Sequence, residues 1–304
     1  MTNAKNILAP LLGPALFVLF LNLDLGLNRA QGVFLAIFIF VVYNWLIARL
    51  PLFVTGFIGV ALSVLLGVED ATTALSSFAH PIIFLFLAGF LFAKSLNETG
   101  LDRRVSLYIL GRDFIGASFE RLLFSLFALT AFFSMWVSNT ATTAMMLPIV
   151  LGTAKSLNIQ DNKTLAFMLL GLAYSASVGG LGSPVGSPPN IIAIGMLKEL
   201  AGIHISFAQW ALFGVPLALA FLFIIFFYVI KRIPAQNKRI DTAFIHNEAQ
   251  KLLKISLREK WLILLFSLLL VCWFAPGLLS GLLGESFPRL NVLEKRMDPG
   301  AVGM

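Results

Sequence analysis

The chain has 304 residues; 59% are hydrophobic, 29 are phenylalanine and only 12% are charged. A soluble domain carries about 25% charged residues, so this composition excludes an ordinary soluble protein and predicts an all-α polytopic membrane protein. The net charge of +7 does not indicate nucleic acid as a partner, because the basic residues stand beside apolar runs and mark orientation in a lipid bilayer. The single cysteine, Cys272, excludes an intrachain disulfide.

Eight apolar runs follow one another along the chain. They cover residues 7–23, 31–48, 52–68, 81–96, 122–154, 165–197, 207–230 and 261–283. A spanning helix needs about 20 apolar residues, so six of the runs predict one plain spanning helix each. The runs 122–154 and 165–197 are too long for one crossing and too short for two full ones.

The distribution of basic residues decides how the run 122–154 is threaded. Lys/Arg-rich loops face the cytoplasm, and the N-terminus is therefore assigned to the cytoplasm. The remaining basic clusters, those of 103–121, 155–163 and 231–260, all reach the cytoplasm only if 122–154 enters and leaves on one side. Arg29, in a predicted outside loop, is the exception. We therefore expect a re-entrant helical hairpin with its tip near Ser138–Thr140.

The run 165–197 is interrupted rather than folded back. The stretch Ser183–Pro189 contains three prolines and follows three glycines. Proline lacks the backbone N–H that a regular helix needs, and glycine permits close backbone approach. The pattern predicts a broken helix.

The segments between the runs are polar or mixed. Residues 102–119 predict an amphipathic segment on the cytoplasmic surface. Residues 231–260 predict a cytoplasmic linker with some helix. The tail 285–304 is polar and proline-containing, and we expect it to be disordered.

The predicted hairpin tip concentrates polar side chains inside apolar sequence. Ser134 and Ser138 are four residues apart and share one face of a helix. Asn139 is predicted to cap the returning helix, whose positive N-terminus attracts an anion. The broken helix offers freed carbonyls at Ser183–Gly186 for a cation and N–H groups at Ser187–Asn190 for an anion. We expect the two interruptions to meet and form half of a transport site.

The ion is inferred from the residue types that are missing. The runs 122–154, 165–197 and 207–230 contain no Asp or Glu. Proton-driven carriers hold a buried carboxylate or histidine, so neutral oxygens favour sodium. The scattered histidines make no metal set, and no nucleophile–base pair indicates an enzyme. No catalytic residue and no organic cofactor is expected.

Two stretches resemble a known family. Ser138-Asn139-Thr140, within the stretch 134–148, resembles the Ser-Asn-Thr signature of the divalent anion/sodium symporter (DASS) family. The stretch 173–190 resembles that family's unwound fifth helix, and the likeness runs from about Ile7 to Trp261.

The resemblance implies sodium-coupled uptake of a divalent anion by an elevator mechanism in a homodimer of the inner (plasma) membrane. The substrate would be a dicarboxylate, a tricarboxylate or sulfate. It assigns residues 1–121 to the scaffold, 122–230 to half of the transport domain, and 261–284 to the first helix of a second inverted repeat. By the match, sodium would be held by Ser134, Ser138, Asn139 and Gly186, and the substrate by Asn139, Thr140 and Ser187.

The family carries two Ser-Asn-Thr hairpins, and this sequence has one such tripeptide. We therefore expect a truncated chain, the N-terminal half, that is inactive alone. Two alternatives remain open at this point. One is a sodium-independent anion permease or channel, and the other is a non-functional membrane fragment.

Overall fold

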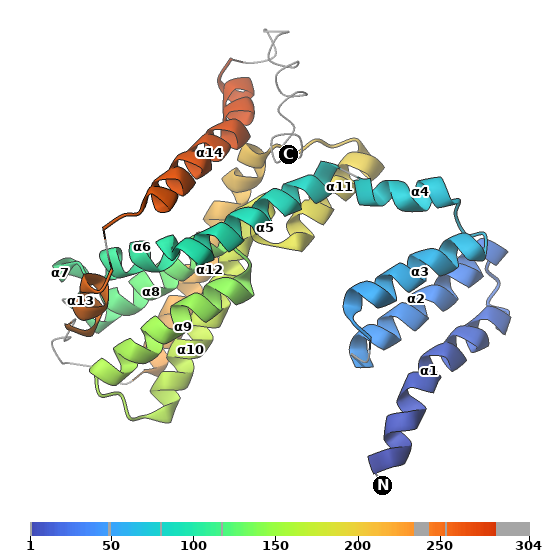
Figure 1. Ribbon diagram of the computed structural model, residues 1–304, viewed down its shortest axis with the longest axis horizontal. Helices are drawn as coiled ribbons and strands as arrows, with labels where there is room; N and C mark the ends of the chain where they lie inside the picture. Colours follow the sequence, from blue (N-terminus) through green and yellow to red (C-terminus); the bar gives the residue numbers. More distant parts are fainter. Residues whose placement is uncertain are drawn as a thin grey trace. The chain divides into compact units, whose positions relative to one another are not determined.

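The computed structural model describes residues 2–47, 50–79, 81–116, 118–233, 243–252 and 254–283. Within these ranges every regular element is a helix and no strand occurs, as Figure 1 shows. The all-α fold class is thereby confirmed. The chain divides into two units, Met1–His80 and Pro81–Met304. The predicted tail 285–304 and part of the predicted linker lie outside the described residues.

The N-terminal unit is a row of helices that pack in chain order. Its elements are α1 (Thr2–Asn22), α2 (Arg29–Ile47), α3 (Leu52–Leu65), α4 (Ala71–Ser76) and the 3-10 turn η1 (Ser77–Ala79). Asn28 and Gln31 cap the start of α2 reciprocally, each backbone N–H donating to the other's side-chain oxygen. The absent side chain of Gly59 lets α3 approach α2, because a Cβ there would lie 2.8 Å from Cγ2 of Val41.

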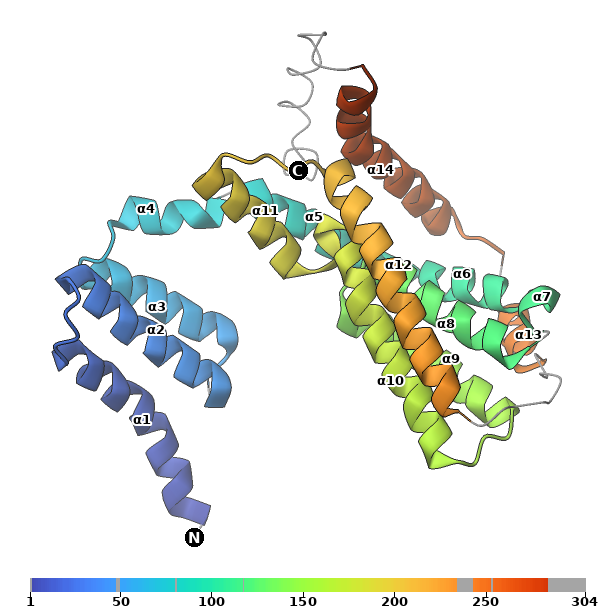
Figure 2. The same cartoon turned by 180° about the vertical axis from the view of Figure 1, so that it is seen from behind.

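The C-terminal unit carries both long apolar runs. Its elements are α5 (Pro81–Thr99), α6 (Leu101–Leu110), α7 (Asp113–Gly116), α8 (Phe119–Ser134), α9 (Asn139–Ser156), α10 (Asn162–Gly179), η2 (Gly180–Gly182), η3 (Pro184–Gly186), α11 (Pro188–Ala201), α12 (Phe207–Arg232), α13 (Ala243–Gln250) and α14 (Leu257–Leu283). Helices α8, α9, α10 and α12 lie side by side in both views (Figures 1 and 2). Their shared core buries Phe127, Met146, Met168 and Leu172 almost completely.

Several of these helices begin where the sequence supplies a cap. The Asp161 carboxylate accepts the backbone N–H groups of Lys163 and Thr164 at 3.1 and 2.9 Å, which starts α10. Hydrogen bonds from the Thr164 hydroxyl and backbone hold the pKa of Asp161 below its usual value. Ser206 and Gln209 form a capping box at the start of α12.

Ion pairs join α6, α13 and α14. The Arg104 guanidinium lies 2.6 Å from the carboxylate of Glu259, whose side chain is only 3% exposed. Arg103 lies 2.5 Å from Glu248 on α13. The described end of the linker is therefore tied to α6, where the sequence predicts the cytoplasmic surface.

Among the described helices, three stretches are long and apolar enough to cross a membrane: Arg29–Ile47, Asn162–Gly182 and Phe207–Arg232. Leu11–Asn22 and Leu52–Leu65 are shorter apolar helices. Exposed leucines and phenylalanines cover their outer faces, for example Leu212 and Phe213 on α12. Such faces are stable against lipid and not against water.

Helices α8 and α10 approach each other through glycines. A Cβ on Gly171 would lie 2.1 Å from Cζ of Phe127, and a Cβ on Gly179 would lie 2.2 Å from the backbone oxygen of Ala131. A phenylalanine ring can turn aside, but a helix backbone cannot. Gly179 therefore sets how closely the two helices meet.

Gly179→Ala is expected to lower the free energy of unfolding by about 1–3 kcal/mol, because the added methyl meets backbone. Thermal unfolding of the detergent-solubilised chain, followed by circular dichroism, measures the effect. Gly56→Ala on α3 is the matched control, since its Cβ would meet nothing within 4 Å. Equal unfolding temperatures for Gly179→Ala and wild type would contradict the close approach.

Candidate functional site

The turn 135–138 separates α8 from α9 at the predicted hairpin tip. Ser138 caps α9, because its hydroxyl oxygen accepts the backbone N–H of Ala141 at 3.3 Å. The prediction that Asn139 is the cap was wrong. Asn139 is the first residue of α9, and its side-chain oxygen accepts instead from the Ser134 hydroxyl at 2.6 Å. Ser134 itself is completely buried.

The α-helical part of the second run stops at Gly179 and resumes at Pro188, with two 3-10 turns between. Ser183 lies in the break with extended backbone and no exposed surface. Its hydroxyl donates to the backbone oxygen of Met135 and accepts the N–H of Gly186 at 3.0 Å. One buried hydroxyl thus joins the turn after α8 to the break after α10.

Oxygen atoms from both interruptions converge at two glycines. A Cβ on Gly186 would lie 2.7 Å from the oxygen of Gly180 and 3.0 Å from the oxygens of Ser134 and Met135. A Cβ on Gly180 would lie 2.7 Å from Oδ1 of Asn139 and 3.2 Å from the oxygen of Gly186. We call these five residues the oxygen cluster. It is uncharged, because it consists of backbone carbonyls, an amide oxygen and a hydroxyl.

The structure places three of the six predicted site residues in the oxygen cluster and the other three at the starts of α9 and α11. Ser134, Asn139 and Gly186 belong to the oxygen cluster. Ser138 is exposed and occupied as the cap of α9. Thr140 is exposed in the first turn of α9, and Ser187 is half-buried at the start of α11, where its side chain makes no capping hydrogen bond. The residues expected to face an anion thus stand at helix N-termini.

Sequence reasoning missed the side chains that hold the break together. Nδ2 of Asn190 donates to the oxygens of Gly180 and Ser183 at 2.7 and 2.9 Å. The indole N–H of Trp210 on α12 donates to the oxygen of Leu181 at 3.0 Å. For Asn190, the available signal was its position as a polar residue directly after two prolines in an apolar run. Its partners could not be read from the sequence, because they are backbone atoms brought near by the break.

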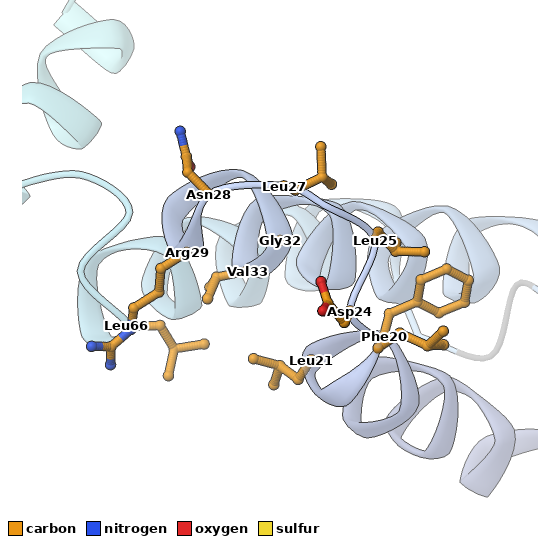
Figure 3. A pocket seen from close by; sticks show the side chains of 11 residues that line it. Phe20, Leu21, Asp24, Leu25, Leu27, Asn28, Arg29, Gly32, Val33 and Leu66 are labelled. Carbon is orange, nitrogen blue, oxygen red and sulfur yellow. The ribbon is translucent and has the colours of Figure 1, made fainter.

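A pocket lies within the N-terminal unit, at the turn between α1 and α2 and the end of α3 (Figure 3). Its volume is about 250 Å³, and five of its eleven lining residues are leucines. Asp24 and Arg29 are the charged residues at its wall. Charged groups at helix ends are common orientation and stability features, so we assign no ligand to it.

The helical fold, its apolar outer faces and the buried oxygen cluster define a multi-pass membrane protein with an interrupted-helix site. A model of the family described as citrate transporter (CitMHS) matches residues 10–302. The chain belongs to this family. The membership confirms the resemblance to the divalent anion/sodium symporters, and the family is one of transporters and not of enzymes.

Several relatives are similar to this chain over most of its length. An "uncharacterized transporter" of Haemophilus influenzae is 34% identical over 291 residues, which are 92% of this chain and 59% of that protein. The sodium-dependent dicarboxylate transporter SdcS of Staphylococcus saprophyticus is 31% identical, over 89% of this chain and 54% of its own. SdcS of Staphylococcus aureus is 32% identical over 75% of this chain and 45% of its own length. The chain spans about half the length of the curated relatives it matches.

Ser183→Ala is expected to lower the free energy of unfolding by about 2 kcal/mol. It removes the donor to the Met135 carbonyl and leaves the Gly186 N–H with only its 3.4 Å bond to the backbone oxygen of residue 183. Thermal unfolding in detergent is the measurement. Ser177→Ala is the control, since that exposed hydroxyl donates only to the carbonyl of Ala173 in its own helix. If the two variants lose the same small amount, Ser183 does not join the two interruptions.

Proposed function

We propose that this chain supplies one sodium site and part of one anion site of a sodium-coupled carboxylate transporter. The observation that carries the proposal is the oxygen cluster, in which the hairpin turn and the broken helix bring neutral oxygens together. The relatives named sodium-dependent dicarboxylate transporter support the choice of ion and substrate.

Sodium is a hard cation and takes oxygen ligands. We assign it to Ser134, Asn139, Ser138 and the backbone of Gly186. The Ser134 hydroxyl donates to Asn139 Oδ1, and the lone pairs of its own oxygen remain for a cation. The C-terminal end of α10 adds partial negative charge from its last carbonyls. A site of this kind selects a monovalent cation without any buried carboxylate.

The anion is assigned to the starts of α9 and α11, with Asn139, Thr140 and Ser187 as its contacts. The first N–H groups of a helix have no acceptor within it and point toward a bound anion. Asn139 belongs to both assignments, as its side chain is in the oxygen cluster and its backbone opens α9. A bound sodium ion attracts the carboxylate of a substrate beside it, so the binding of one favours the binding of the other. Dicarboxylate is the first choice, with tricarboxylate and sulfate as the other anions.

We further propose that the packed block of α8, α9, α10 and α12 moves as one body, as in an elevator mechanism. The buried core that these helices share supports the proposal, because a close-packed core moves as a unit. The same core also includes residues of α5, α6, α13 and α14, so these helices would move with the block. A homodimer in the plasma membrane, with the N-terminus in the cytoplasm, completes the proposal on the basis of charge distribution and family resemblance.

Sodium binding by the chain itself is the first test. Adding sodium chloride in place of choline chloride is expected to raise the unfolding temperature of wild type, because a ligand that binds only the folded state stabilises it. Asn139→Ala is expected to lose this rise, while Asn162→Ala, an exposed residue at the start of α10, keeps it. A rise that persists in Asn139→Ala would contradict the assignment.

Coupling is tested by uptake of labelled succinate into vesicles that contain the protein. If the chain takes up succinate by itself, the uptake is expected to require an inward sodium gradient and to be abolished by Asn139→Ala. The absence of any uptake would agree with the expectation that the chain is inactive alone. Potassium or choline gradients of equal size serve as controls. Uptake that is independent of sodium would instead favour an anion permease.

A further inference from the structure

Asn190 stands in the first turn of α11, directly after Pro188 and Pro189, and only 5% of its surface is exposed. Both hydrogens of its amide nitrogen are used on backbone carbonyls of the break. Nδ2 lies 2.7 Å from the oxygen of Gly180 and 2.9 Å from the oxygen of Ser183. The side chain therefore spans the break from its first turn to its middle.

These carbonyls lie in the break itself, and the Ser183 carbonyl has a long backbone hydrogen bond, from the N–H of Gly186 at 3.4 Å. Both lie beyond Gly179, where α10 ends, and so outside the regular hydrogen bonding of that helix. A continued α-helix would pair the Gly180 carbonyl with the N–H of residue 184, but that residue is a proline and has no N–H. The Asn190 amide supplies a donor to each of the two carbonyls inside the protein, where water is not a substitute.

One of the two carbonyls belongs to the oxygen cluster. The oxygen of Gly180 lies 2.7 Å from the position that a Cβ on Gly186 would occupy. A carbonyl oxygen has two lone pairs, so it can accept from Asn190 and still coordinate a cation. Without the amide, this oxygen would be free to turn away from its neighbouring carbonyls, which repel it.

We propose that Asn190 is a positioning residue for the sodium site: it fixes the Gly180 carbonyl in the oxygen cluster without touching the ion. This role rests on the proposed sodium binding. It predicts that the amide contributes to sodium affinity separately from the stability of the sodium-free protein. A residue that served packing alone would affect only the stability of the sodium-free protein.

The test is a sodium titration of the purified full chain at constant ionic strength, with choline as the replacement cation. The unfolding temperature gives the apparent affinity for sodium, and the value without sodium gives the stability. Asn190→Ala and Asn190→Leu both remove the donors, and the leucine keeps the number and branching of the side-chain heavy atoms. Both are expected to bind sodium about tenfold more weakly.

Asn44 provides the matched control. It is 6% exposed, donates from Nδ2 to the oxygen of Phe40 at 2.8 Å, and lies in the N-terminal unit. Asn44→Ala is expected to lower stability without sodium and to leave the affinity unchanged.

Two outcomes overturn the role of Asn190 alone: wild-type affinity in Asn190→Leu, or an equal loss of affinity in Asn44→Ala. If wild type does not respond to sodium, the proposed function fails and this role fails with it. The wild-type titration thus separates the two failures.

Discussion

The need to pair every backbone polar group inside an apolar environment governs this structure. A continuous helix meets that need by itself, but the break between Gly179 and Pro188 does not. Three side chains meet it instead, those of Ser183 and Asn190, which are buried, and that of Trp210, which is half-buried. Ser183 pairs the turn 135–138 with the break, Asn190 holds two carbonyls, and Trp210 donates to a third from α12. The polar side chains of this region are therefore consequences of the broken helix as much as contributors to a site.

Glycine makes the same pairing geometrically possible. The hydroxyl of Ser183 reaches Met135 only because α8 and α10 lie close together, and Gly179 permits that distance. Gly180 and Gly186 then leave room for the oxygens that a side chain would displace. Close helix packing, the break and the oxygen cluster are thus one arrangement. A methyl group added to any of these three glycines would disturb all of it.

Sequence reasoning predicted the parts of this arrangement that depend on local pattern. Apolar runs of the right length became helices, and the hydroxyl-rich stretch at 134–143 holds the turn between α8 and α9. The α-helix of the second run stops at Gly179, before the prolines. The cap of α9 was misassigned by one residue, because serine and asparagine both cap helices and only the bond from Ser134 to Asn139 separates them.

The pairings of Ser183, Asn190 and Trp210 depend on tertiary distance and leave no periodic trace in the sequence.

The same pairings also bear on how a site without charge could hold sodium. A carboxylate attracts a cation from any nearby position, whereas a carbonyl dipole does so only when it points at the ion. Affinity must then come from orientation fixed before the ion arrives. Buried hydrogen bonds that restrain the Gly180 and Met135 carbonyls provide that orientation, so the side chains around such a site matter as much as its ligands.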